Sequence, residues 1–188
     1  GVIRYTITPT ANGCSGTPVT VDVTVNPTPT LSTTPGQQTI CAGTAPSIVL
    51  SNPNAVAATL YRWTVVQSGT TGASNQVALV AGPIAQTLNL SIVNVQGTAT
   101  YTIEAVSPAS CVSSTKQVII TVDPVPDAAA SIQTICSGGT TSVVITNPNA
   151  VSGTSFAWTS VQFGGAIVSG HSSGNGALIS QNLTVVNA

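Results

Sequence analysis

The chain repeats itself with a period of about 95 residues, and this repeat limits the possible folds more than any other feature. Three motifs recur 95 positions later: Gln-Thr-Ile-Cys at 38–41 and 133–136, Asn-Pro-Asn-Ala-Val at 52–56 and 147–151, and aromatic-X-Trp-Thr at 61–64 and 156–159. Two more link the start of the chain to its middle: Tyr-Thr-Ile at 5–7 and 101–103, and a Val-X-Pro-X-Pro segment at 25–29 and 122–126. A fixed period of this length indicates tandem copies of one structural unit.

Within one period the pattern is that of short β-strands. Residues 31–126 alternate β-branched and polar residues, and no helical period is present. Seven strands are predicted, near residues 37–41, 45–50, 59–66, 76–80, 86–93, 98–106 and 115–123. Seven short strands with turn signals about every ten residues are typical of an immunoglobulin-like β-sandwich. The predicted fold is therefore all-β, with tandem immunoglobulin-like sandwiches of about 95 residues each.

The spacing of the matches divides the chain into one whole repeat and two partial ones. Residues 31–126 form a complete repeat, residues 1–30 match the C-terminal part of a preceding repeat, and residues 127–188 match the N-terminal part of a following one. A partial sandwich leaves strand edges and apolar surface open. We therefore expect further copies of the same repeat, in the same chain or in neighbouring subunits, to complete both ends.

Four aromatic residues are assigned to sandwich cores. Trp63 and Trp158 occupy equivalent positions, and each follows another aromatic residue by two positions, which puts both on one face of a strand. One buried Trp in the third strand is characteristic of such sandwiches. Tyr5 and Tyr101, at another pair of equivalent positions, are assigned to the core as well. An exposed aromatic platform for sugars is the alternative interpretation.

Four widely spaced cysteines, Cys14, Cys41, Cys111 and Cys136, include no C-x-x-C pair. This spacing argues against a zinc site and favours disulfides in an exported protein, with buried free thiols as the alternative. Cys41 and Cys111 belong to the same complete repeat and are predicted to pair, which would stabilise it by roughly 4 kcal/mol. Cys14 and Cys136 are expected to find partners in adjoining repeats or subunits.

Very few charged side chains are present, and this limits the possible partners. Lys, Arg, Asp and Glu make up 4% of the chain and the net charge is −1, whereas about 25% charged residues is usual. Nucleic acids and anionic membranes need clusters of Lys and Arg, so neither is an expected partner. Apolar runs are too short for membrane insertion.

No catalytic residue, cofactor or metal ligand is expected. Residues 170–174 (Gly-His-Ser-Ser-Gly) fit the G-x-S-x-G pattern of hydrolases, but that pattern needs a helix and a later His, and His171 is the only histidine. Asp123 and Asp127 at the joint between repeats could hold calcium. Against this, Asn26 replaces Asp123 at the other joint.

The joints themselves are rich in proline. Asn26-Pro27-Thr28-Pro29 and Asp123-Pro124-Val125-Pro126 leave two repeats in the same way. Alternating prolines favour extended, semi-rigid connections. We therefore expect a string of sandwiches that keeps its direction.

Three segments of the chain form a combined pattern: residues 5–14 (Tyr-Thr-Ile-Thr-Pro-Thr-Ala-Asn-Gly-Cys), residues 21–29 and Thr39-Ile40-Cys41. This pattern resembles the PKD-like (polycystic-kidney-disease-type) repeats of very large Bacteroidota surface proteins. The resemblance implies a β-sandwich, export by the type IX route and display as an adhesin of the gliding type. One departure is that Thr64-Val65-Val66 follows Trp63, where PKD domains have an acidic, Gly-containing motif.

Together these features predict a non-catalytic structural or adhesive segment of an extracellular surface fibre or adhesin. Its expected partners are further copies of the repeat and a surface glycan or other substratum. Specific binding, where present, is expected in the loops at 67–76 and 164–176. The alternative is a carbohydrate-binding accessory module of a secreted enzyme, which would need exposed aromatic side chains on one face.

Overall fold

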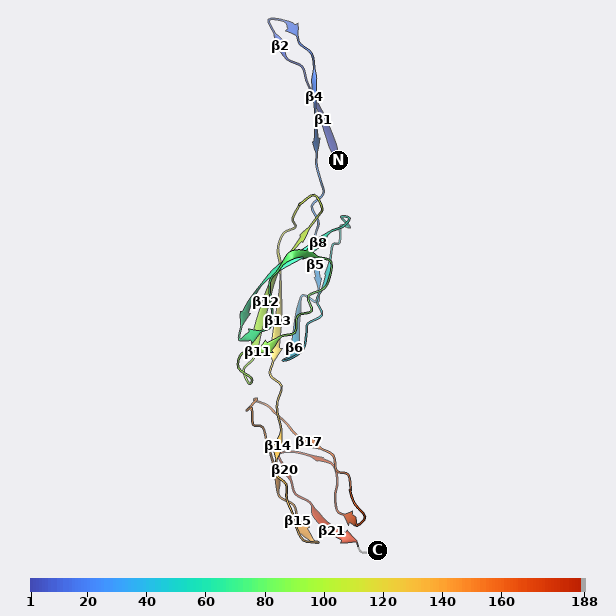
Figure 1. Cartoon of the computed structure of the whole chain (residues 1–188), viewed down its shortest axis with the longest axis vertical. Helices are drawn as coiled ribbons and strands as arrows, with labels where there is room; N and C mark the ends of the chain where they lie inside the picture. Colours follow the sequence, from blue (N-terminus) through green and yellow to red (C-terminus); the bar gives the residue numbers. More distant parts are fainter. Residues whose placement is uncertain (187–188) are drawn as a thin grey trace.

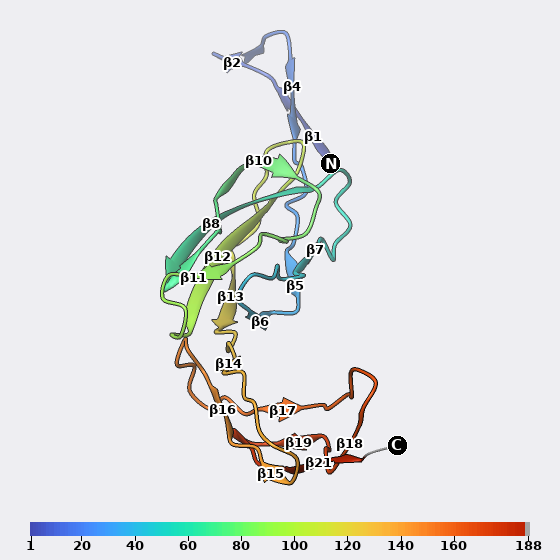
Figure 2. The same ribbon diagram turned by 60° about the horizontal axis from the view of Figure 1, so that its bottom comes forward.

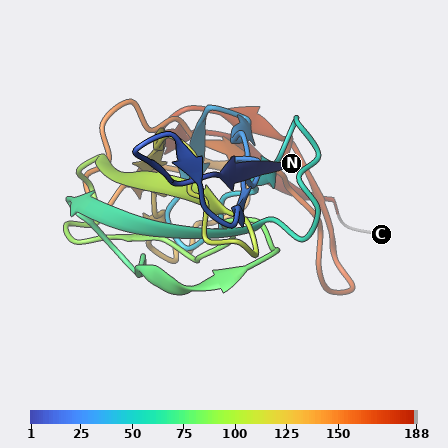
Figure 3. The ribbon, with the colours of Figure 1, turned by 90° about the horizontal axis from the view of Figure 1, so that it is seen from above.

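The computed structural model describes residues 1–186, and in this range every regular element is a β-strand. The chain forms three lobes arranged in a line: a hairpin, a sandwich and a more open set of small sheets (Figure 1). A view along the long axis shows the lobes superposed (Figure 3). The all-β prediction is confirmed. Among the described residues no helix has the length and apolarity to cross a membrane.

The first lobe is a two-stranded hairpin with a smaller hairpin at its tip. Its strands are β1 (Val2–Ile7), β2 (Thr10–Ala11), β3 (Cys14–Ser15) and β4 (Val19–Thr24). The tip turns at Asn12 and Gly13, which have φ angles of 51° and 82°. Asn-Gly favours two positive φ angles, and such turns match the twist of a hairpin.

The central lobe, which begins near residue 30, contains nine strands. They are β5 (Ser32–Thr34), β6 (Gln37–Cys41), β7 (Val49–Ser51), β8 (Leu60–Ser68), β9 (Thr70–Thr71), β10 (Gln76–Val80), β11 (Asn89–Leu90), β12 (Gly97–Val106) and β13 (Lys116–Asp123). One layer is a five-stranded sheet in the order β10-β8-β12-β13-β6 (Figure 2). The other layer consists of short pairs, β5 with β7 and β9 with β11, and isolated bridges such as Ile48 with Ile84.

The core of the central lobe follows from the alternation in its two central strands. Ala99, Tyr101, Ile103 and Ala105 on β12 are fully buried, as are every second residue of β13 from Val118 to Val122. Ile48, Leu50, Ile84 and Leu88 from the second layer belong to the same cluster. Each large apolar side chain removed from water contributes about 1.5–3 kcal/mol, so this cluster dominates the stability of the lobe.

The described part of the third lobe contains eight short strands, each of two to five residues. They are β14 (Ala129–Ala130), β15 (Gly139–Thr140), β16 (Val143–Thr146), β17 (Ala157–Trp158), β18 (Ile167–Ser169), β19 (Gly174–Asn175), β20 (Leu178–Ile179) and β21 (Asn182–Val186). β17 is the counterpart of β8, yet it has two residues where β8 has nine. β8 is paired along its full length by β12, whereas β17 pairs only with β19 over two residues.

Candidate assembly surfaces

The hairpin of the first lobe has an apolar face that no other described part of the chain covers. Its side chains are 43–55% exposed: Ile3, Tyr5, Ile7, Val21 and Val23. β1 pairs with β4 in the register of β12 with β13, so that Tyr5 lies opposite Val21 as Tyr101 lies opposite Val118. Tyr101 and Val118 are fully buried in the central lobe. Tyr5, expected in a core, is 53% exposed here because no second layer lies against the hairpin.

The opposite face of the hairpin is polar. Arg4 and Asp22 face each other across the two strands, and the guanidinium donates two hydrogen bonds of 2.7 Å to the carboxylate. The hydrogen bond with Arg4 lowers the pKa of Asp22 below its usual value. Both side chains are exposed to solvent, so this ion pair contributes little to stability. The hairpin is therefore two-faced, as the inner strands of a sandwich are.

The third lobe lacks a closed core within the described residues. Its counterparts of buried central-lobe residues are only half-buried: Ile135, Val143, Ile145, Trp158, Ile179 and Leu183. Backbone bonds repeat at the same offset, since Gly138 N donates to Leu183 O as Gly43 N donates to Leu88 O, both at 2.8 Å. In the central lobe, β12 and β13 separate β8 from β6. In the third lobe, β17 corresponds to β8 and residues 132–136 correspond to β6, and no described strand lies between them.

The two joints between lobes are built in the same way. At the first joint, Asn54 donates through Nδ2 to Thr28 O at 2.9 Å and accepts from Thr30 N at 2.9 Å. At the second joint, Asn149 donates to Val125 O at 2.8 Å and accepts from Asp127 N at 3.0 Å. Each asparagine side chain thus holds the Pro-containing linker that enters its own lobe. Successive lobes are connected by a repeated contact.

All four cysteines are free thiols in the structure. Cys41 ends β6 beside Asp123, at the end of the sheet where β12 begins. Cys111 lies beyond the other end, in the connection between β12 and β13. The seven residue pairs of the β12–β13 ladder separate the two by roughly 20 Å at about 3.3 Å per residue. Because a disulfide needs Cα atoms within about 7 Å, the expected Cys41–Cys111 bond does not fit this fold.

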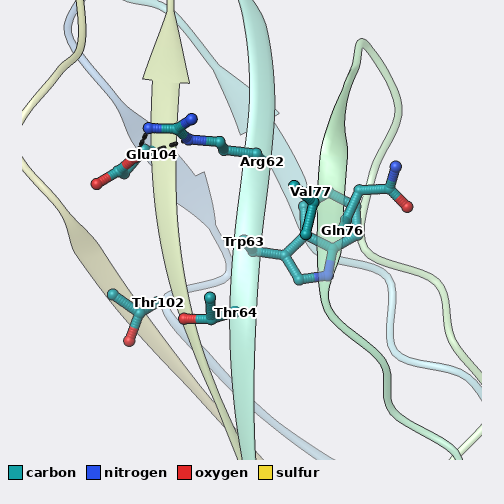
Figure 4. Close-up of a pocket in the computed structure, with 7 residues that line it drawn as sticks. All are labelled: Arg62, Trp63, Thr64, Gln76, Val77, Thr102 and Glu104. Atoms are coloured by element: carbon teal, nitrogen blue, oxygen red, sulfur yellow. Dashed lines mark hydrogen bonds and ion pairs between the residues drawn. The ribbon is translucent and has the colours of Figure 1, made fainter.

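A shallow hollow lies beside β8 on the five-stranded sheet, lined by Arg62, Trp63, Thr64, Gln76, Val77, Thr102 and Glu104 (Figure 4). Arg62 donates to Glu104 Oε2 from Nε and Nη2 at 2.9 and 2.8 Å, which leaves the hollow close to neutral. Trp63 is only 6% exposed, and its buried indole N–H has no hydrogen-bond partner. The ring therefore offers no open face for a sugar to stack on.

The residues considered for catalysis and metal binding do not come together. The Ser172 hydroxyl accepts a hydrogen bond from Gln181 Nε2 at 2.9 Å, and His171 contacts Ser160 at 3.0 Å instead. Asp123 accepts from Gln96 Nε2 at 2.6 Å. Among residues 1–186 no three side chains of His, Cys, Asp or Glu gather into a metal-binding group.

Comparison with known families gives one match, which falls on the first lobe. The family model of the PKD-like domain matches residues 1–29, the segment that contains the hairpin and the first joint. PKD-like domains are in general structural or adhesive, non-catalytic modules, and they usually occur in extracellular or surface proteins. No curated protein matches the chain.

Proposed function

We propose that the chain is a structural and adhesive repeat segment of an extracellular surface fibre, and that it acts through length and repetition. The observation that carries the proposal is the match between its two open surfaces. The hairpin presents the apolar face of an inner strand pair, and among residues 127–186 no such pair lies between β17 and residues 132–136. The resemblance to PKD-like repeats of gliding adhesins exported by the type IX route supports display at the cell surface.

In this proposal, each open lobe is completed by a second copy of the repeat. The hairpin β1–β4 of that copy inserts beside β17 in the register that β12 has beside β8. Ile7 of the second copy then lies opposite Trp158, as Ile103 lies opposite Trp63. The chain that follows the inserted hairpin continues into the next sandwich through the Pro-containing joint, so that the assembly grows in one direction.

Insertion of the hairpin would bury apolar surface and form new backbone pairing at the joint. Five apolar side chains that are about half exposed in the hairpin would become buried, and each contributes about 1 kcal/mol. Insertion would also form two backbone ladders, one on each side of the hairpin. The equivalent ladders of the central lobe have nine residue pairs between β8 and β12 and five between β13 and β6. The added pairing would extend β17 toward the length of β8.

The test compares two aspartate substitutions at neighbouring positions of β4. Val21→Asp puts a charge on the apolar face, while Thr20→Asp puts the same charge on the opposite face, at the counterpart of exposed Gln117. Light scattering on a concentration series should show head-to-tail oligomers for the unchanged chain and for Thr20→Asp. Val21→Asp should remain a monomer. Equal assembly of both variants would refute insertion of the hairpin.

Native material distinguishes separate subunits from one long polymer. Mass spectrometry under denaturing, reducing conditions should give a discrete species of 18.6 kDa for subunits, or a very large chain if the repeats are continuous. Electron microscopy should show a beaded fibre in both cases. A compact particle would contradict the proposal.

A carbohydrate-binding module is the second candidate function, and one aromatic residue favours testing it. Phe163 is 90% exposed in the turn between β17 and β18, directly before the loop at 164–176 where binding is expected. Titration with polysaccharides should perturb the NMR signals of this turn if it binds glycans. Phe163→Ala removes the aromatic ring, and loss of the perturbation in this variant would assign binding to the turn.

A further inference from the structure

Cys111 lies at the first joint, next to the chain that leaves the preceding repeat. Its Sγ is 3.9 Å from the carbonyl oxygen of Asn26. The turn that carries it is fixed by Ser107, which accepts from Cys111 N through Oγ at 3.2 Å and donates its own N–H to Cys111 O at 3.0 Å. A cysteine of the central lobe is thus held against the exit of the first lobe.

The repeat also determines which residue of a neighbouring strand would lie beside Asn26. Asn26 corresponds to Asp123, and Cys41 is the cross-strand partner of Asp123 in the parallel pairing of β13 with β6. The next residue, Ala42, donates its N–H to Asp123 O at 2.9 Å. In a completed first lobe, the counterpart of Cys41 therefore lies beside Asn26. In a second copy of this chain that counterpart is Cys136.

The second joint repeats this arrangement with the other two cysteines. The linker contacts of Asn149 reproduce those of Asn54, and Ala42, which follows Cys41, shares a hollow with Asn149 and Val125. Cys41 therefore stands at the exit of the central lobe. The counterpart of Cys111 in the following lobe is Cys14 of the second copy, which the same geometry brings against Asp123.

We propose that disulfides staple neighbouring repeats together across the joints, and that none forms within a repeat. When two copies join head to tail, Cys136 of one chain bonds to Cys111 of the next, and Cys41 of the first chain bonds to Cys14 of the next. This inference rests on the proposed assembly of copies. It gives all four cysteines a partner.

Each bond forms by oxidation of two thiols. Two S–H bonds break, one S–S bond forms, and two protons and two electrons pass to an external disulfide, which is reduced to two thiols. The oxidant is a small-molecule or protein disulfide of an oxidising compartment. Oxidised glutathione supplies it in the experiment below. Both cysteines of each pair lie beside the same linker residue, Asn26 or Asp123, and a disulfide requires their Cα atoms about 4.4–6.8 Å apart.

Two double variants separate staples between repeats from bonds within a repeat. Cys14→Ser/Cys41→Ser leaves Cys111 and Cys136, which should join chains into a ladder on a non-reducing gel. Cys41→Ser/Cys111→Ser leaves Cys14 and Cys136, which lie at opposite ends of the same completed sandwich and should give monomer only. Both variants retain two cysteines, so random oxidation would affect them equally. Equal ladders, or a ladder from the second variant alone, would overturn the inference.

Assembly and stapling are measured separately. Light scattering under reducing conditions reports whether the copies associate at all, and the gel after oxidation reports the bonds. Association without a ladder in Cys14→Ser/Cys41→Ser would refute the staples and leave the proposed assembly intact.

A fusion of two copies provides the test if separate chains do not associate. Residue 188 is joined to Gly1 of the second copy through Asn-Val-Gln, the residues at positions 94–96 of the complete repeat. Peptide mapping of the oxidised fusion should recover Cys136 bonded to Cys111 of the second copy. Recovery of Cys41 bonded to Cys111 of its own copy would refute the inference.

Discussion

Replacing Ile120 by Ala should destabilise the central sandwich far more than replacing its neighbour Ile119. Ile120 is fully buried within the core cluster, whereas Ile119 points to the other face of β13 and is 39% exposed. Truncation of a buried Ile removes its transfer free energy and leaves a cavity, which together cost about 3–4 kcal/mol. Truncation of Ile119 should cost less than about 1 kcal/mol.

Thermal unfolding gives the comparison directly. For a unit of this size, 1 kcal/mol shifts Tm by about 4–8 °C, so Ile120→Ala should lower Tm by about 15–25 °C and Ile119→Ala by a few degrees. Trp63 is 6% exposed and reports the opening of this core by fluorescence, and a Trp158→Phe background removes the second emitter. Equal shifts for the two variants, or a larger one for Ile119→Ala, would refute the assignment of faces on β13.

Three further outcomes test other parts of the fold. Burial raises the pKa of the Tyr101 phenol to about 12, whereas it is about 10 in an unfolded chain. The unfolded chain therefore loses this proton first, and the stability of the sandwich should fall as pH rises from 10 to 12. Tyr101→Phe should reduce this fall in unfolding curves measured at alkaline pH. Gly72→Ala should lower Tm strongly because φ is +96° and a Cβ would collide with a backbone carbonyl, whereas Gly82→Ala, with open space around it, should have little effect. Asn54→Ala removes the side-chain contacts that hold the first joint, and small-angle scattering should then show a wider range of lobe orientations with an unchanged Tm of the sandwich.

The repeat itself was accessible from the sequence because equivalent positions carry similar side chains. The sequence matches Tyr5 to Tyr101 and residues 25–29 to residues 122–126, and in the structure β1 pairs with β4 in the register that β12 has with β13. The aromatic pattern around Trp63 points to the core in the same way, and the side chain lies there. The division of the chain near residues 30 and 126 stays a prediction.

What the sequence could not predict depends on neighbours in space. Residues 156–159 repeat residues 61–64 closely, yet β17 has two residues and β8 has nine, because the length of a strand depends on the strands that pair with it. The cysteines illustrate the same limit. Their positions in the repeat assign Cys41 and Cys111 to one unit, but only the order of strands in the sheet reveals that they lie at its opposite ends.

Staples across the joints would make a fibre of such repeats almost inextensible, and pulling on a multi-copy fusion would reveal this. If every sandwich is unfolded, the shortest covalent path along the fibre uses one disulfide per copy, from Cys136 to Cys111 of the next copy. Within each copy this path then follows only the 25 residues from Cys111 to Cys136. At about 3.4 Å per residue, two repeats of an oxidised fibre could extend to only about 90 Å.

A fully reduced fibre would extend to about 650 Å per two repeats, since the whole chain then carries the force. If the disulfides instead joined Cys41 to Cys111 within each repeat, only about 25 residues per repeat would lie outside the closed loops. Such a fibre would extend to about 170 Å per two repeats. Force spectroscopy on an oxidised four-copy fusion should therefore show no long unfolding steps from its two internal copies until a reductant is added. Long steps from the internal copies before reduction would show that the joints are not bridged, because a copy with a disulfide across each of its joints has little extra length to release.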